Sequence, residues 1–192
     1  MTTKSVPLSC FGFRRVASES KHEDMTDAVV RPYRPGDHSA GRTLWAELAE
    51  GRSGLYGISP GADPGAGFED YLTRIDLSGI WVAEDPEEGV IGLVGLLMEG
   101  TTGEVEPIVV AARHRGSGVG AKLLKHVSGE AKKRSLARLT IRPESRNVEA
   151  LKSLHAAGFD LLSAVELSLD LHPAPSTVDN VDIDLFGLRF RS

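Results

Sequence analysis

The spacing of hydrophobic residues changes from segment to segment along the chain, and each spacing predicts one type of element. Alternating or unbroken apolar runs predict β-strands, whereas apolar residues three or four positions apart predict helices. Strands are therefore expected at residues 28–33, 80–84, 90–98, 104–110, 137–141, 159–162 and 164–171. Helices are expected at residues 37–49, 68–75, 119–131 and 147–157. The predicted order is β-α-α-β-β-β-α-β-α-β-β.

Several of these predictions depend on single residues or short runs. Asp37 is expected to act as the N-cap of the first helix, and Gly158 to end the last one. The glycine-rich residues 51–67 predict a mobile loop. In the last predicted strand apolar and polar residues alternate, so they lie on opposite faces. The apolar face carries Val165, Leu167, Leu169 and Leu171, and the polar face carries Glu166, Ser168 and Asp170.

The two ends of the chain lack this regular patterning. Residues 1–26 show no sustained periodicity and are expected to form a flexible extension, with Met25 as a candidate true start. Residues 27–172 are expected to form one domain, and residues 173–192 a C-terminal tail. Residues 181–190 alternate well enough to form a strand that pairs across a homodimer or covers the subunit's own sheet. Disorder is the alternative for this tail.

Composition and charge limit the kinds of partner. A formal net charge of −5 over 192 residues gives no support for nucleic-acid binding. No apolar run approaches the roughly 20 residues that cross a bilayer, so no membrane partner is expected. The single cysteine excludes an intrachain disulfide framework and is consistent with a reducing compartment. A cytoplasmic protein without a metal is therefore expected.

The strand at residues 104–110, the following glycines and the next helix form the most informative stretch. The first amides of a helix have no partner within it, and the helix dipole is positive there, so the turn is expected to bind an anion. A dinucleotide fingerprint fails at Ala121, where a third glycine belongs, and a Walker A loop needs a Gly-Lys-Ser/Thr that is absent. A turn whose glycines only allow close packing remains an alternative.

Two overlapping arginine patterns narrow this expectation. Both Arg113-x-x-Gly116-x-Gly118 and Arg115-x-x-Gly118-x-Gly120 satisfy Arg/Gln-x-x-Gly-x-Gly/Ala. In this feature the chain resembles the GNAT superfamily of acyl-CoA-dependent N-acetyltransferases. The run from Asn147 to Gly158-Phe159 looks like the family's second segment, and the resemblance covers residues 27–172.

The resemblance implies an α/β (α+β) fold of the GNAT type. The expected central sheet is mixed and mostly antiparallel, with six to seven strands and with helices on both faces. Its fourth and fifth strands are expected to splay apart, and coenzyme A is expected to lie in that gap. Pro107, in the middle of the fourth strand, fits this geometry, because proline is tolerated only at a bulge or an edge.

The resemblance also implies a set of cofactor contacts, with acetyl-CoA as the co-substrate. The backbone of Val109 and Val110 is expected to bind the pantetheine arm. Asn147 is expected either to contact the cofactor or to cap its own helix. The pyrophosphate is expected to bind the amides of Arg115, Gly116, Ser117, Gly118, Val119 and Gly120.

Acetyl transfer to an amine requires a base, an oxyanion donor and a proton for the leaving thiolate. Glu106 and Glu104 are the candidate bases, and by simple alternation they share a face with Ile108 and Val110. The Val110 amide is the donor that the resemblance implies. His155 stands where the family usually has a tyrosine, and it is the candidate acid.

The predicted function is transfer of an acetyl group from acetyl-CoA to a primary amine by direct attack in a ternary complex. The alternative is a GNAT-fold module that binds acyl-CoA without turnover, as a sensor or regulatory domain. The resemblance implies an acceptor pocket shaped by residues 51–67, with Tyr56, and by the region around Ser163. A small amine, an amino acid, an aminoglycoside, and a protein lysine or N-terminus all stay open as acceptors.

Overall fold

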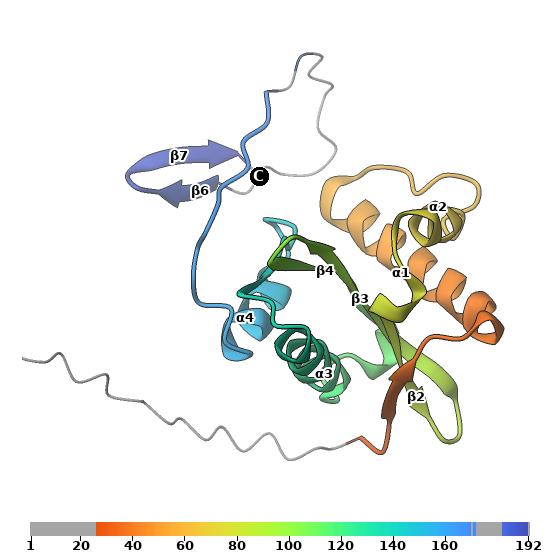
Figure 1. The fold of residues 1–192 in the computed structure, drawn as a ribbon. Coiled ribbons are helices and arrows are strands. Elements are labelled where there is room, and N and C mark those ends of the chain that lie inside the picture. The colour runs from red at the N-terminus through yellow and green to blue at the C-terminus, as the bar shows by residue number, and fades with distance from the viewer. Residues whose placement is uncertain (1–25, 170, 172–181, 192) are drawn as a thin grey trace, which may run out of the picture.

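A computed structural model describes residues 26–169, 171 and 182–191 of the chain (Figure 1). The predicted N-terminal extension, apart from its last residue, and the candidate start at Met25 lie outside the described residues. So do residues 173–181 and 192 of the predicted tail, together with residue 172 at its boundary with the domain.

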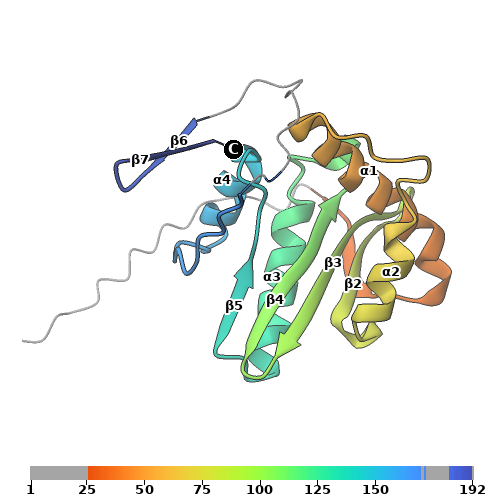
Figure 2. The ribbon, with the colours of Figure 1, turned by 90° about the horizontal axis from the view of Figure 1, so that it is seen from above.

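A five-stranded sheet forms the centre of the molecule, with the strands in chain order from one edge to the other (Figure 2). Neighbouring strands are antiparallel, except that β4 and β5 are parallel. The strands are β1 (Val29–Pro32), β2 (Ile80–Asp85), β3 (Gly89–Glu99), β4 (Thr102–Val110) and β5 (Arg138–Ile141). These five strands confirm the sequence prediction to within one or two residues at most ends.

Helices cover both faces of this sheet (Figure 2). In the part of the chain that the structure describes, the α-helices are α1 (His38–Tyr56), α2 (Gly67–Arg74), α3 (Val119–Lys133) and α4 (Val148–Ala156). Three 3-10 turns join them to strands, namely η1 (Pro35–Asp37), η2 (Leu77–Gly79) and η3 (Ala112–His114). The helices α1 and α2 pack on one face, and α3 packs on the other.

Two buried clusters fill the spaces between sheet and helices. The cluster under α3 joins strand residues such as Ile91 and Val94 to Val119, Leu123 and Val127 of the helix. The cluster under α1 and α2 contains Leu44, Phe68, Tyr71, Val82, Leu93 and Val109. Each helix therefore presents its apolar stripe to the sheet, as its three-to-four spacing predicts.

The helix α1 continues through Gly51 and Gly54, so the prediction of a loop beginning at Gly51 was wrong. The helix ends at Gly57, which has a left-handed φ of 67° and whose amide bonds to the Ser53 carbonyl at 2.7 Å. Glycine lowers helix propensity by only about 1 kcal/mol. Tertiary contacts of the last turn, described below for Tyr56, offset that cost.

Asp37 does not cap α1 with its side chain, contrary to the prediction. It already lies in the 3-10 turn, with φ −84° and ψ 0°, instead of in the extended conformation of an N-cap. Its carboxylate accepts bonds from the Arg31 guanidinium at 2.7 and 2.9 Å and from the Arg34 amide at 2.8 Å. Arg31 also binds Glu84 on β2. Asp37 therefore ties the start of α1 to β1 and β2.

The two strands predicted at residues 159–162 and 164–171 are not formed in the part of this region that the structure describes. An alternating pattern gives a strand only when its apolar face meets a partner, and here residues 161–169 are all exposed, with Leu167 at 67% and Leu169 at 83%. Over the described residues the central sheet accordingly has five strands, where six to seven were expected.

The tail forms a small hairpin of β6 (Asp182–Leu185) and β7 (Leu188–Arg191), where either one strand or disorder was expected. Phe186 and Gly187, both with positive φ, make the turn. The hairpin is a sheet of its own, so among the described residues it does not extend the central sheet.

Candidate active site

The strands β4 and β5 separate halfway along β4. Their parallel pairing starts at Thr102 and Arg138 and ends at Val105 and Ile141. The second half of β4 therefore has no strand partner on that side among the described residues. This gap is the splay that the sequence analysis predicted between the fourth and fifth strands.

A β-bulge interrupts β4 where the gap begins. Gly95 of β3 lies opposite both Glu106 and Pro107, because the register between the two strands shifts there. Pro107, which cannot donate a ladder hydrogen bond, occupies the bulge as predicted. The bulge adds one residue to β4, so side chains beyond it change faces.

This change of face corrects the expectation that Glu104 and Glu106 share a face with Ile108 and Val110. Ile108 and Val110 pack against the cluster under α3. Glu106 instead pairs with Arg74 of α2, and Glu104 lies on the same face two residues earlier. Simple alternation failed because it assumed an unbroken strand. Both carboxylates therefore lie on the face that α1 and α2 cover.

Tyr71 of α2 holds the bulge in place. Its ring is fully buried, and its hydroxyl donates a 2.9 Å hydrogen bond to the Glu106 main-chain carbonyl. A Cβ on Gly95 would overlap the Tyr71 hydroxyl, so this contact needs glycine there. Burial, and then the nearby Glu106 charge, raise the pKa of Tyr71 well above its usual range. The hydroxyl therefore stays a donor.

Each candidate base is ion-paired with an arginine. Glu104 accepts a bond from Arg142, the residue after β5, with 2.6 Å between Oε1 and Nη1. Glu106 Oε1 lies 3.3 Å from Nη2 of Arg74. The four side chains are all partly exposed, from 21% for Glu104 to 71% for Arg142. The face of β4 that carries the carboxylates therefore presents charges of both signs to solvent.

The predicted anion-binding turn lies directly beyond the gap. Gly116 and Gly118 have φ values of 78° and 92°, which favour glycine, and α3 begins after Gly118. A Cβ at either glycine would meet no atom within 4 Å, and at Gly120 it would meet only Val110 Cγ2 at 3.8 Å. The first amides of α3 have no carbonyl partner within the helix. Two of the predicted amides are already paired, Arg115 with the Ala112 carbonyl and Ser117 with the His114 carbonyl, both at 3.3 Å. The open amides that fit a pyrophosphate are therefore those at the start of α3.

Two side chains of the turn brace it internally. Arg115 donates from Nε to the Val110 carbonyl at 3.3 Å, at the carboxyl end of β4. The Ser117 hydroxyl donates to the His114 carbonyl at 2.6 Å. These two bonds hold residues 115–120, which were predicted to bind the pyrophosphate, in one turn next to the end of β4.

Two glutamates that sequence reasoning missed also fix this turn. Glu47 of α1 accepts a 2.6 Å bond from the Ala112 amide, although 65 positions separate the two residues. Glu88, in the β2–β3 turn, lies 2.6 Å from Arg113 Nε and 3.2 Å from His114 Nε2. No local sequence signal could have identified these residues, because their roles depend on tertiary proximity.

The amide of Val110 points into the gap. The Ala111 amide donates to the Ile91 carbonyl of β3 at 2.9 Å, and Val110 itself is paired with Gly92. Because successive amides of a strand point to opposite sides, the Val110 amide points away from β3, and the Val109 amide points toward it. Of the two residues predicted to bind the pantetheine arm, Val110 thus has its amide available, whereas Val109 buries its side chain in the core.

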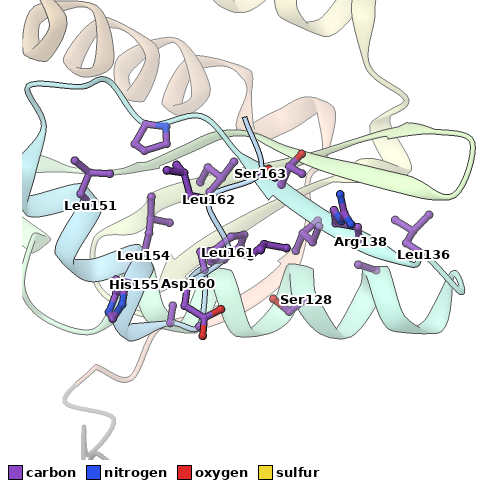
Figure 3. A pocket seen from close by; sticks show the side chains of 18 of the residues that line it. Ser128, Leu136, Arg138, Leu151, Leu154, His155, Asp160, Leu161, Leu162 and Ser163 are labelled. Carbon is purple, nitrogen blue, oxygen red and sulfur yellow. The ribbon is translucent and has the colours of Figure 1, made fainter. Parts of the chain in front are cut away.

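Asn147 and His155 lie at the two ends of α4. The Asn147 Oδ1 accepts a 3.1 Å bond from the Ala150 amide, so the capping alternative is confirmed. His155 is exposed and lies near the end of α4, at the rim of a cleft of about 960 Å³ (Figure 3). The cleft lies between α3, β5 and α4, on the sheet face opposite to the two carboxylates. The three candidate catalytic residues therefore lie on the two opposite faces of the sheet.

The residues expected to shape an acceptor pocket are not brought together. Ser163 lines the cleft beside α4 (Figure 3). Tyr56 instead ends α1, where its hydroxyl donates a 3.0 Å bond to Glu144 and its ring stacks under Arg146. These contacts join the last turn of α1 to the β5–α4 loop.

Among the residues that the structure describes, no cluster of His, Cys, Asp and Glu side chains is arranged to hold a metal ion. No helix in the described ranges is long and apolar enough to cross a membrane.

Comparison with solved structures shows the same fold. A tetramutant of the BH1408 protein from Bacillus halodurans is 17% identical, with a TM-score of 0.61, and the match covers 73% of this chain and 99% of that one. A ribosomal-protein-alanine N-acetyltransferase from Brucella melitensis is 21% identical, with a TM-score of 0.56 and coverage of 68% and 83%. AAC(6')-Iy in complex with the bisubstrate analogue CoA-S-monomethyl-acetylneamine is 16% identical, with a TM-score of 0.54 and coverage of 76% and 99%.

Comparison of sequences identifies the family. No curated protein matches the chain. The sequence profile of the acetyltransferase (GNAT) family matches residues 41–159, which include the gap, the bulge and the glycine turn. The chain therefore belongs to the acetyltransferase (GNAT) family.

Proposed function

We propose that this protein is an N-acetyltransferase that moves an acetyl group from acetyl-CoA to a primary amine by direct attack in a ternary complex. One observation carries the proposal. The strand β4 leaves β5 at Val105, so its amide at Val110, the Glu106 carboxylate and the glycine turn all border one gap, and Glu104 lies just before it, still paired with Thr140 of β5. Two of the similar structures support an amine acceptor, since one is an alanine N-acetyltransferase and the other binds an analogue that joins coenzyme A to acetylneamine.

Binding and orientation are assigned to the backbone. The amides of Gly116, Gly118, Val119 and Gly120, in the turn and at the start of α3, would hold the pyrophosphate, where the helix dipole favours negative charge. The Val110 amide would donate to the acyl oxygen as negative charge develops on it. A donor fixed in a strand needs no reorganisation during the reaction, which is why such donors are effective.

Proton transfer is assigned to side chains on the two sides of the gap. Glu106, with Glu104 beside it, would take the proton of the attacking ammonium, because a protonated amine has no lone pair. His155 would supply a proton to the leaving thiolate from the α4 side. This division lets the amine enter from the face of α1 and α2 while the cofactor stays on the other side.

The alternative is a module that binds acyl-CoA without turnover. One observation favours it, namely that both candidate bases are held by arginines, which compete with an acceptor ammonium for the same carboxylates. A coenzyme A release assay with acetyl-CoA and a panel of amines separates the two functions. Acceptor-dependent thiol release that is abolished in Glu106→Gln supports the enzyme. Tight acetyl-CoA binding without release by any amine would leave the module.

A further inference from the structure

The candidate acceptor face carries matched positive and negative charges. On this observation, and resting on the proposed function, we infer that the acceptor is a zwitterion, an amine with a carboxylate close to it, as in a free α-amino acid. The overall charge of −5 would suit a cationic amine. The charges beside the candidate bases lead to a different conclusion.

Two arginines flank the two carboxylates from different elements. Arg74 comes from α2 and approaches Glu106, and Arg142 follows β5 and approaches Glu104. Glu104 and Glu106 are two residues apart on one strand face, about 7 Å between Cα atoms. A small ligand can therefore contact a carboxylate and a guanidinium at the same time.

A zwitterion satisfies such an arrangement better than a cation does. An ammonium that displaces an arginine from Glu106 leaves that guanidinium without its partner, and two positive charges then lie side by side. A ligand that also carries a carboxylate binds the released guanidinium, so every charge keeps a partner. A polyamine or an aminoglycoside offers only positive charges, and it therefore meets repulsion from Arg74 and Arg142.

A cleft lined by the Glu104–Arg142 pair, one of the two, can receive the rest of such a ligand. It has a volume of about 370 Å³ and lies over β3, β4 and β5, where the Leu97 side chain, opposite Glu104, gives it an apolar wall. Arg138 lines the same cleft and has no ion-pair partner among the described residues. The volume lies at the small end of the range for ligand pockets, which suits an amino acid more than a macromolecule.

The experiment compares each acid with its own uncharged derivative. Coenzyme A release from acetyl-CoA is measured with the twenty L-amino acids, with their α-amides and with spermidine. The amide keeps the amine and the side chain but lacks the negative charge. A charge-assisted hydrogen bond implies that the best amino acid exceeds its amide by about 10- to 100-fold in kcat/KM. The same compounds are titrated calorimetrically into the complex with coenzyme A, which tests binding without turnover.

Variants assign the preference to the arginines. Arg142→Gln and Arg74→Gln are expected to reduce the ratio of acid to amide at least about tenfold, with the KM for acetyl-CoA unchanged. Arg189→Gln is the matched control, because this exposed arginine lies on the hairpin of β6 and β7, outside the site. It is expected to leave the ratio as it is in the parent protein.

The outcomes separate the inference from the proposed function. Amides or spermidine that react as well as the acids would overturn the zwitterion while leaving the N-acetyltransferase intact. Calorimetric binding of an acid but not of its amide, without any thiol release, would retain the zwitterion site and remove the enzyme. A ratio of acid to amide that both arginine variants leave unchanged would also overturn the inference.

Discussion

The Tyr71 hydroxyl donates a 2.9 Å hydrogen bond to the main-chain carbonyl of Glu106. This contact joins a buried ring of α2 to the bulge of β4, and Gly95 leaves the space for it. Because the bulge determines which face the β4 side chains take, a hydroxyl in the core helps to orient the candidate catalytic carboxylate.

Removing that hydroxyl is expected to weaken both the fold and the reaction. Tyr71→Phe leaves the Glu106 carbonyl without its donor, so the free energy of unfolding should fall by about 1–2 kcal/mol. The kcat should also fall, with the KM for acetyl-CoA unchanged, because the anion-binding turn is not touched. Urea denaturation and steady-state kinetics measure the two effects.

Tyr33→Phe is the control for this prediction. Tyr33 is buried in the same cluster, and its hydroxyl makes no hydrogen bond with any of the described residues. Its removal should change stability less than the removal of the Tyr71 hydroxyl. If both variants lost the same free energy of unfolding, the hydrogen bond to the Glu106 carbonyl would contribute no measurable stability.

The sequence predicted the elements from β1 to α4 well, but not the face that each β4 residue occupies. Hydrophobic spacing is a local property, so it located the five strands and the helix after the glycines. The bulge depends on Gly95 and Tyr71, which are distant in sequence, and no local pattern marks their contact. The pairings of Glu47 and Arg74 were missed for the same reason. Residues 159–169 show the opposite failure, because a strong strand pattern there lacks a paired neighbour.

Glycine at position 120 is predicted to be retained for the ligand and not for the fold. Gly120→Ala places a Cβ within a helix at an ordinary 3.8 Å contact with Val110 Cγ2, so it should stabilise the protein by about 0.5–1 kcal/mol. The same Cβ keeps the backbone away from a pyrophosphate, and the affinity for coenzyme A should drop at least about tenfold. Thermal denaturation and calorimetric titration with coenzyme A measure the two quantities.

Gly129→Ala provides the comparison on the same helix. A Cβ at Gly129 meets no atom within 4 Å, and this residue lies far along α3 from the turn. It should give the same gain in stability with no change in affinity for coenzyme A. If Gly120→Ala bound coenzyme A as well as Gly129→Ala does, the pyrophosphate would have to lie elsewhere.

The stability of the fold should depend on pH through Asp37. The hydrogen bond from Arg31, opposed in part by burial, lowers the pKa of this carboxyl below its ordinary value of 3.8. A lowered folded-state pKa stabilises the protein above the unfolded value, and this contribution is lost as the pH falls through the folded value. Asp37→Asn should therefore cost about 1.5–3 kcal/mol at neutral pH.

Urea denaturation between pH 7 and pH 2 tests this pH dependence. The difference between the parent protein and Asp37→Asn should be constant near neutrality and should shrink below about pH 4. Asp160→Asn, at an exposed position, serves as the reference and should follow the parent protein. A difference that stays the same down to pH 2 would contradict a charged Asp37 in the folded protein.

His155 can be tested by a pair of aromatic replacements that differ in a single hydroxyl. His155→Phe removes the proton donor, so kcat should fall at least about tenfold, since positioned acid–base catalysis contributes roughly 10² to 10⁴. His155→Tyr introduces the residue that the family resemblance led us to expect at this position, and it should retain more of the kcat. Because His155 is exposed, neither change should disturb the core.

The comparison of Phe with Tyr determines the role of His155. Steady-state kinetics over a range of pH give kcat for both variants, and the KM for acetyl-CoA reports any loss of binding. Equal kcat values in Phe, Tyr and the parent protein would remove His155 from the mechanism and transfer proton donation to water.

The bulge at Pro107 also governs how residues of this chain can be matched to those of relatives. Before Pro107, residues 104 and 106 face α1 and α2, and beyond it residue 109 takes that face. A relative without the bulge has one residue fewer in this strand. A sequence alignment that places the missing residue elsewhere would match Val109 to the counterpart of Val110. It would then assign the amide that points away from β3 to the wrong residue. Functional assignments carried between family members therefore have to be anchored separately on the two sides of Pro107.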